Sequence, residues 1–309
     1  MNEFDIFGNP VKKKYKLTDT FIANPFSIIK SYGGDWNKRK NKWLSLGIKS
    51  ELGRSTKGNN QYQSLDRKRM SESVKKISEI GKTASIFDPA LCEVLYHWFC
   101  PNDSNILDCF AGGSVRGIVA NYLGYKYTGI ELRQEQVLAN IEQGKNILHD
   151  NCPEWICGDS NKVLDKMNIE QKFDFLFSCP PYYNLEIYSD ESGDLSNMDY
   201  EEFDNAYESI IRKSCEKLKN NRFACFVVGN CRDKEGFMKD LVGLTIKAFE
   251  KSGLRFYNDI ILEQVIASGA MRAKNTMKHR KVVKIHQNIL VFCKGNPKIY
   301  SDETKGELI

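Results

Sequence analysis

Apolar and polar positions change their spacing near residue 86, and from there the chain alternates between two patterns. Short apolar runs are typical of buried strands, whereas apolar residues at every third or fourth position are typical of amphipathic helices. Strands are predicted at 105–108, 127–131, 155–157, 173–177, 224–229, 255–265 and 285–292. Helices are predicted at 91–99, 115–123, 134–148, 203–218 and 237–252, with a short helix that Ser160 could cap.

Strands that alternate with helices of about 10–15 residues predict an α/β fold with a mostly parallel, doubly wound sheet. Ligands bind such sheets at the carboxyl ends of the strands. The first 80 residues lack this alternation. We therefore expect an N-terminal extension (1–80), one α/β domain (81–300) and a short tail (301–309).

The composition is that of a soluble globular protein, with 309 residues, 41% of them hydrophobic and 28% charged. We find no apolar run of membrane-spanning length and no signal-peptide pattern, so we expect a cytoplasmic protein that does not bind membranes. The ten cysteines form no C-x-x-C pair. This spacing argues against a metal site and favours reduced, mostly structural thiols.

Charge is unevenly distributed along the chain. Residues 1–80 hold 17 Lys and Arg against 8 Asp and Glu, whereas residues 81–309 hold 28 against 32. The N-terminal extension, here also called the front end, is therefore basic. A basic segment suggests a polyanionic partner, and nucleic acid is the most common one. Trp36 and Trp43 lie among lysines and arginines there, so they could stack on bases or pack inward from a small helix.

Three predicted strands end in residues suited to a nucleotide-like ligand. The first runs into a glycine-rich turn, LDCFAGGSVRG (107–117), which would let backbone amides approach a ligand closely. Glu131 ends the second strand, 23 residues after Asp108, a spacing typical of a carboxylate that binds ribose hydroxyls. Asp159 follows the third and could accept a hydrogen bond from an adenine amine. S-adenosylmethionine fits these features. Each feature also has a purely structural explanation: the glycines could form an ordinary turn, Glu131 could begin a helix, and Asp159 could cap one.

The fourth strand ends in SCPPYYN (178–184). Two prolines make a rigid backbone, and the carbonyl of Pro180 could accept a hydrogen bond from an amine whose lone pair must leave conjugation. The ring of Tyr182 could stack on a base taken out of the duplex. This motif therefore favours methyl transfer to an exocyclic amine.

With these motifs the chain resembles the S-adenosylmethionine-dependent amino-methyltransferases of DNA, which methylate adenine N6 or cytosine N4. LDCFAGGS resembles their DPFAGSG cofactor loop, and SCPPY resembles their [DNS]-P-P-[YF] catalytic motif. TASIFDPAL (83–91) and HQNILVFCKG (286–295) resemble the segment before the loop and a late strand. The front end (24–54) resembles that of phage and prophage-type methylases. The resemblance implies a Rossmann-like methyltransferase fold with a late antiparallel strand, S-adenosylmethionine as cofactor and double-stranded DNA as substrate.

The resemblance also implies roles for matching residues. Those implied to bind the cofactor are Phe87, Pro89, Asp108, Phe110, Ala111, Gly112, Gly113, Glu131, Leu132, Asp159 and Ser160. Those implied for catalysis are Cys179, Pro180, Pro181 and Tyr182. The chain departs from the family at Ser114, where a glycine is usual, and at Cys179, where Asp, Asn or Ser is usual. A thiol is a weak acceptor, so the second acceptor for the amine is open among Ser178, Asn184 and Glu186.

Two basic segments are the candidates for contacting DNA: the front end and the stretch 267–284, expected to be a loop. The residues proposed for this role are Lys38, Arg39, Lys40, Arg272, Lys274, Lys278, Arg280 and Lys281. The sequence does not indicate a partner nuclease or a recognition site.

Adenine N6 is the preferred target, and several alternatives stay open. Cytosine N4, RNA or a protein amide could take the place of adenine in the same chemistry. Cys179 could instead be the nucleophile of a cytosine carbon-5 enzyme. The protein could also bind DNA without catalysis.

Overall fold

The computed structural model describes residues 21–49, 87–183, 193–266 and 269–303. Asn184, Glu186 and most of the predicted tail lie outside the described residues, as do the larger part of the N-terminal extension and part of the segment 83–91. Among the described helices, none is both long and apolar enough to cross a membrane.

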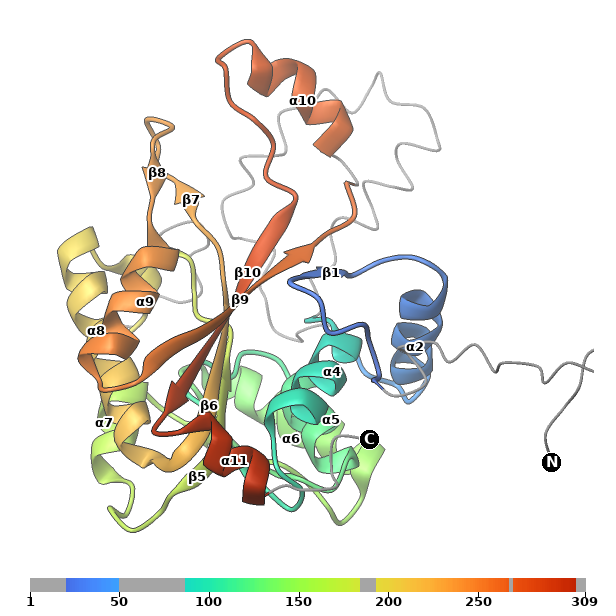
Figure 1. Ribbon diagram of the computed structural model, residues 1–309, viewed down its shortest axis with the longest axis vertical. Helices are drawn as coiled ribbons and strands as arrows, with labels where there is room; N and C mark the ends of the chain where they lie inside the picture. The colour runs from blue at the N-terminus through green and yellow to red at the C-terminus, as the bar shows by residue number, and fades with distance from the viewer. Residues whose placement is uncertain (1–20, 50–86, 184–192, 267–268, 304–309) are drawn as a thin grey trace, which may run out of the picture.

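The described residues form a twisted central sheet with helices packed around it (Figure 1). The sheet has eight strands in the order β1-β9-β10-β6-β5-β2-β3-β4. Its strands are β1 (Ile28–Lys30), β2 (Asn105–Asp108), β3 (Lys126–Glu131), β4 (Glu154–Cys157), β5 (Phe173–Ser178), β6 (Leu218–Val228), β9 (Arg255–Glu263) and β10 (His286–Lys294). β10 runs antiparallel to both of its neighbours, and every other pair is parallel. The predicted doubly wound α/β fold with a late antiparallel strand is therefore confirmed.

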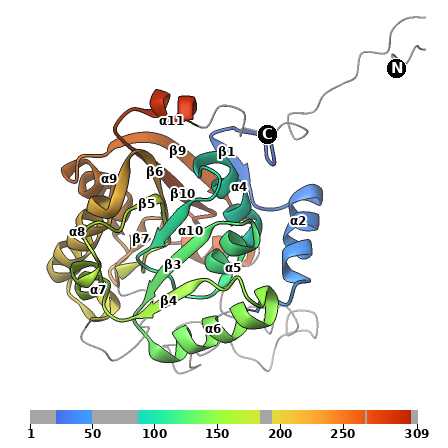
Figure 2. The ribbon, with the colours of Figure 1, turned by 90° about the horizontal axis from the view of Figure 1, so that it is seen from below.

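Helices cover both faces of the sheet, so that the molecule has three layers (Figure 2). The helices are α2 (Gly34–Leu44), α4 (Pro89–Phe99), α5 (Val115–Tyr122), α6 (Gln134–Leu148), α7 (Ser160–Lys166), α8 (Tyr200–Lys217), α9 (Leu241–Lys251), α10 (Gly269–Met277) and α11 (Pro297–Glu303). Successive residues of a strand point to opposite faces. Phe175 and Phe177 of β5 therefore pack toward α4 and α5, whereas Leu176 packs toward α8 and α9. This double burial explains the continuous apolar runs in the sequence.

The structure corrects several predicted element boundaries and one predicted loop. Asp159, not Ser160, caps α7, because its carboxylate accepts a hydrogen bond from the amide of Asn161 at 2.9 Å. Leu218 begins β6 instead of ending α8, and residues 237–239 belong to a hairpin of β7 (Cys231–Arg232) and β8 (Met238–Lys239). The expected loop 267–284 contains α10.

The described part of the front end is joined to the α/β body. β1 extends the sheet beside β9, and α2 packs on α4. Both tryptophans of α2 point inward and donate their indole N–H to carboxylates near or on α4. Trp43 bonds Glu93 at 2.6 Å, and Trp36 bonds Asp88 at 3.0 Å. Of the two interpretations of these tryptophans, the structure supports the inward-packed helix.

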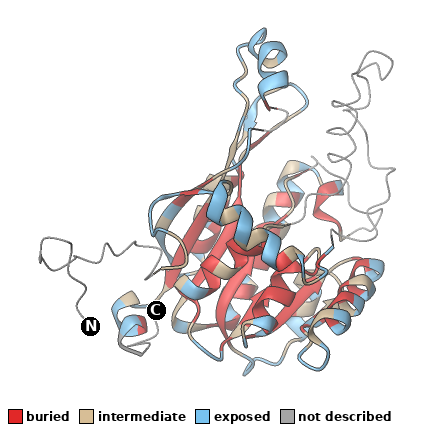
Figure 3. Ribbon diagram, turned by 90° about the vertical axis from the view of Figure 1, so that its right-hand side faces the viewer, coloured by how far each residue is buried: buried red, intermediate tan, exposed pale blue. Residues whose placement is uncertain are grey.

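Two projections rise from the carboxyl edge of the sheet (Figures 1 and 3). One is the β7–β8 hairpin, which follows the end of β6. The other, here called the arm, consists of the described residues between β9 and β10 and carries α10. Most side chains of α10 are exposed. Because β9 ends and β10 begins at the edge where β5 and β6 end, the arm stands beside the site that the sequence predicts.

Gly129 in β3 is closely packed, and we expect Gly129→Ala to lower the free energy of unfolding by about 1–3 kcal/mol. An added Cβ would lie 2.6 Å from Cε1 of Tyr127 and 2.9 Å from Cβ of Ala111. Urea denaturation followed by circular dichroism measures the effect. Gly34→Ala in α2 is the control, because a Cβ there meets nothing within 4 Å. Equal stability of the two variants would contradict this packing.

Candidate active site

The carboxyl ends of β2, β3, β4 and β5 meet at one cavity of about 550 Å³, a volume typical of small-molecule sites. Nearly all residues predicted for the cofactor and for catalysis line it. They are Phe87, Phe110, Ala111, Gly112, Gly113, Glu131, Leu132, Asp159, Ser160, Cys179, Pro180, Pro181 and Tyr182. Asp108 and Pro89 do not line the cavity.

The glycine-rich turn is held in place by polar side chains. Gly112 has a φ of +52°, a conformation that favours glycine. Its amide donates to Glu131 at 3.0 Å, and its carbonyl accepts a hydrogen bond from Asn140 at 2.7 Å. Asn140 is fully buried and in turn accepts from Gln136 at 2.8 Å. The turn is therefore rigid before any ligand binds.

Two carboxylates line the cavity beyond this turn. One oxygen of Glu131 accepts from Gly112, and the other accepts from the amide of Arg133 at 3.0 Å. These bonds fix the carboxylate at the end of β3. Asp159 caps α7 through one oxygen. Ser160 donates to the carbonyl of Cys109 at 2.5 Å, which ties the end of β4 to the glycine-rich turn.

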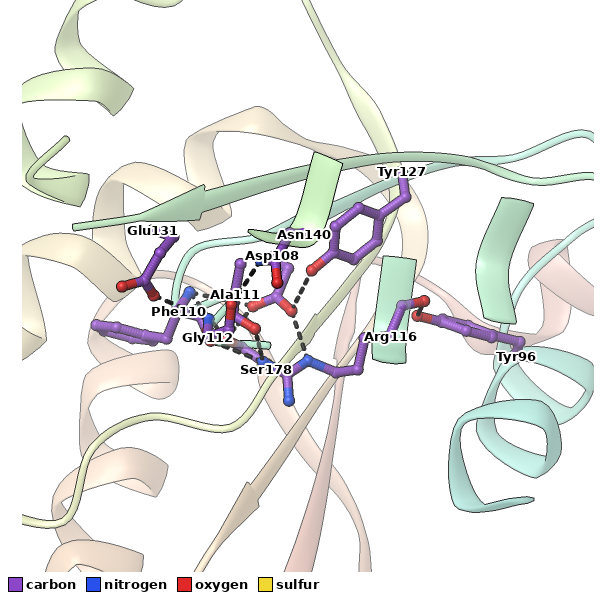
Figure 4. A network of polar contacts seen from close by, with 10 residues as sticks. All are labelled: Tyr96, Asp108, Phe110, Ala111, Gly112, Arg116, Tyr127, Glu131, Asn140 and Ser178. Carbon is purple, nitrogen blue, oxygen red and sulfur yellow. Dashed lines mark hydrogen bonds and ion pairs between the residues drawn. The ribbon is translucent and has the colours of Figure 1, made fainter. Parts of the chain in front are cut away.

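Asp108 is fully buried and lies behind the residues that line the cavity. Figure 4 shows the polar contacts that it makes. Its Oδ2 accepts from Nε of Arg116 at 2.5 Å and from the hydroxyl of Tyr127 at 2.8 Å. Its Oδ1 accepts from the hydroxyl of Ser178 at 2.6 Å and from the amide of Phe110 at 3.1 Å. Burial opposes the charged guanidinium, but the attraction of Asp108 leaves the pKa of Arg116 well above its usual value. The carboxylate thus organises the turn from behind.

The Pro180-Pro181 segment leads into two tyrosines that point to different places. Tyr183 is buried, packs on Phe203 with the ring centroids 4.2 Å apart, and donates a hydrogen bond to Asp204 at 3.0 Å. It has a φ of +43°, an uncommon conformation for a bulky residue that often marks functional sites. The Tyr183 anchor leaves Tyr182 on the cavity side, where its hydroxyl accepts a hydrogen bond from the amide of Gln287.

The candidates for a second amine acceptor lie in different environments. Ser178 is fully buried, and its hydroxyl is engaged with Asp108 and with the amide of Phe110. It does not line the cavity, so it faces the network behind the wall. Asn184 and Glu186 are outside the described residues. Cys179 lines the cavity and is half-buried.

The cavity wall includes residues that sequence reasoning missed. One of them is Arg116, which lies within the glycine-rich stretch 107–117. Because a single arginine on an otherwise apolar helix must be paired if it is buried, its position could have indicated a buried carboxylate partner. Gln264 and Gln287 at the base of the arm, and Asp194, gave no comparable signal. Ser31, Lys40 and Lys49 come from the front end, for which sequence reasoning predicted a role in contacting DNA.

The basic residues proposed to contact DNA fall into two groups. In α2, Arg39 pairs with Glu93 at 2.6 Å, Lys40 with Asp88 at 3.2 Å and Lys38 with the exposed Asp35 at 3.4 Å. The arm residues Arg272, Lys274, Lys278 and Arg280 are exposed, and none pairs with a described carboxylate. Lys281 is half-buried beside Gly236 of the hairpin. Of the residues proposed to contact DNA, those without a described ion pair therefore lie in the arm.

The thiols differ in access, and we expect cofactor to protect Cys179 from alkylation. Only thiolates react with alkylating reagents. Burial raises the pKa of a thiol, as for Cys109, where the pKa reaches about 12, so the buried cysteines should stay unmodified. Cys152, Cys157 and Cys179 are the thiols outside the buried set. Maleimide labelling with peptide mass mapping should modify these three. S-adenosylhomocysteine should slow labelling at Cys179 only, with Cys152 as the internal control. Equal labelling of Cys179 with and without this compound would contradict the assigned site.

No protein-family model matches this chain, and no curated protein matches its sequence. Solved structures with a similar fold include TrmN from Thermus thermophilus, with 11% identity and a TM-score of 0.45 over 67% of this chain and 49% of TrmN. The chain thus spans about half the length of TrmN. A TehB-like SAM-dependent methyltransferase from Corynebacterium glutamicum has 16% identity and a TM-score of 0.42, over 72% of this chain and 94% of that one. Magnesium protoporphyrin IX methyltransferase from Synechocystis, solved with bound SAM, has 11% identity and a TM-score of 0.43, over 73% and 86%.

Proposed function

We propose that the protein is a methyltransferase that uses S-adenosylmethionine to methylate the exocyclic amine of a DNA base. Adenine N6 is the preferred target, and cytosine N4 is the alternative. The observation that carries this proposal is that Pro180 and Tyr182 line the same cavity as the glycine-rich turn, Glu131 and Asp159. A clamp for a planar amine therefore adjoins a site for a nucleoside with a charged tail.

The residues present fit S-adenosylmethionine. Gly112 and Gly113 leave room for close approach, because neither carries a side chain and the turn is already fixed. Glu131 is placed at the end of β3 to accept hydrogen bonds from ribose hydroxyls, and Asp159 at the end of β4 to accept from the adenine amine. When bound, the cofactor supplies an electrophilic methyl group.

The clamp accounts for activation of the amine. The carbonyl of Pro180 accepts an N–H hydrogen bond and draws the nitrogen lone pair out of the ring, and the rigid Pro-Pro backbone keeps this acceptor aimed. Tyr182 stacks on the extruded base. Its position is fixed by the neighbouring Tyr183, which packs on Phe203, and by the hydrogen bond that Gln287 donates to the Tyr182 hydroxyl.

The arm supports DNA as the substrate. The arm rises from the carboxyl edge of the sheet (Figure 3), the edge whose strand ends form the cavity. Its exposed cations have no described carboxylate partner and can pair with phosphates. The cations of α2 are paired within the protein, so the arm is the stronger candidate for the DNA contact.

A competition reaction tests this proposal. Purified protein receives methyl-labelled S-adenosylmethionine together with equal masses of unmethylated duplex DNA and total RNA. We expect the label in the DNA fraction. Label mainly in RNA, or mainly in added protein, would move the same chemistry to another substrate. A protein that binds DNA and no cofactor would overturn the proposed activity.

A further inference from the structure

Arg116 is a buried cation in the cavity wall with one unused edge. It is 5% exposed, and its Nη2 donates to the carbonyls of Phe110 and Ala111 at 2.7 and 2.9 Å. Its Nε bonds Asp108 (Figure 4). Nη1 forms no hydrogen bond or ion pair with any residue that the structure describes. Because a guanidinium carries five N–H donors in a fixed fork, two donors remain available.

The orientation of this free edge is fixed. The bonds to Asp108, Phe110 and Ala111 set the plane of the guanidinium, and the ring of Phe87 covers one face with its centroid 4.7 Å from Cζ. Since Arg116 lines the cavity, Nη1 is the part of the side chain that a ligand can reach. The donors therefore need no rearrangement to bind, which favours affinity.

The surroundings of Nη1 favour an anion. The cavity wall here is formed by the first turn of α5, whose helix dipole attracts negative charge. Lys40 of α2 also lines the cavity. Its ammonium group pairs with Asp88 at 3.2 Å, but it carries three N–H donors and can therefore bind a ligand as well. Arginine suits planar carboxylates in particular. The carboxylates of Glu131 and Asp159 lie elsewhere, at the ends of β3 and β4. There we expect ribose hydroxyls beside Glu131 and the adenine amine beside Asp159.

We propose that Nη1 of Arg116, assisted by Lys40, binds the α-carboxylate of the amino-acid tail of S-adenosylmethionine. This inference rests on the proposed function. It gives Asp108 a different role from the one that the family resemblance implies. Asp108 is a positioning residue that holds Arg116, and the tail of the cofactor meets the guanidinium instead of the carboxylate.

Calorimetry on the full-length protein tests this assignment with two ligands: S-adenosylmethionine and its decarboxylated analogue, which lacks only the carboxylate. For the wild type we expect the analogue to bind about 10- to 100-fold more weakly, as for loss of a hydrogen bond to a charged group. Arg116→Lys keeps the charge beside Asp108 but removes the fork, so it should bind the two ligands within about threefold of each other. Lys40→Met should reduce the ratio of the two affinities in part. Lys42→Met, on α2 but outside the cavity, should leave this ratio at its wild-type value.

Three results would overturn the assignment. Equal affinity of the wild type for both ligands would show that the carboxylate is not recognised. A folded Arg116→Lys variant with the wild-type ratio would place the carboxylate elsewhere, and circular dichroism reports whether the variant is folded. Failure of the wild type to bind either ligand would remove the cofactor itself, and so would distinguish failure of the proposed function from failure of this inference.

Discussion

Tyr182→Ala is expected to lower methyl transfer to DNA by about 10- to 100-fold and to leave the affinity for S-adenosylmethionine within about twofold. Stacking of a base on an aromatic ring contributes about 1–3 kcal/mol, and Tyr182 supplies the ring on the acceptor side of the cavity. Its truncation should not disturb the glycine-rich turn, which is held by Glu131 and Asn140. Initial rates with labelled cofactor and calorimetry without DNA measure the two quantities.

Tyr182→Phe is the matched control, because it keeps the ring and removes only the hydroxyl that accepts from Gln287. It should retain most of the transfer rate. If Tyr182→Ala kept the wild-type rate, stacking at this position would have no part in the reaction. If Tyr182→Phe were as slow as Tyr182→Ala, the hydroxyl and not the ring would carry the effect.

Asp108→Asn is expected to lower the free energy of unfolding by about 3–5 kcal/mol. The carboxylate accepts four hydrogen bonds, and the substitution leaves Arg116 as a buried cation without its counter-charge. Burial and the carboxylate raise the pKa of Tyr127, so its hydroxyl stays protonated and needs a hydrogen-bond acceptor. The N–H₂ group of the introduced asparagine cannot accept that hydrogen bond. Urea denaturation followed by circular dichroism measures the loss.

Asp165→Asn provides the comparison for Asp108. Asp165 pairs with Lys213 at 2.6 Å, but its side chain is 61% exposed, and an exposed pair contributes about 0–1 kcal/mol. The two substitutions remove the same charge in different surroundings. A similar small loss in both variants would contradict the role of Asp108 as the centre of the buried network.

Much of the fold could be predicted because the relevant signals are local. Buried strands covered on both faces give continuous apolar runs, as in 173–177 and 224–229, and these mark β5 and β6. The boundary errors arose where competing local preferences are similar. Asp159 and Ser160 are both good caps, and Leu218 fits the apolar spacing of α8 although it begins β6.

The candidate site was less fully predictable, because part of it depends on long-range contacts. The motifs at the ends of β2 to β5 meet in one cavity, as expected for a parallel sheet. The inward packing of Trp36 and Trp43 depends on carboxylates about 50 residues away, Asp88 and Glu93. No periodicity in the front end could reveal those partners. The contributions of Gln264 and Gln287 likewise depend on where the arm begins and ends.

Mass spectrometry of the reaction product tests the central claim most directly. Unmethylated duplex DNA is incubated with the protein and methyl-labelled S-adenosylmethionine, digested to nucleosides and analysed for the labelled species. We expect adenine methylated on its exocyclic amine, and cytosine methylated on N4 would keep the mechanism with the other base. Cytosine methylated on carbon 5 would assign Cys179 as a nucleophile and contradict the amine clamp. DNA without label, from a protein that binds the cofactor, would contradict DNA as the substrate.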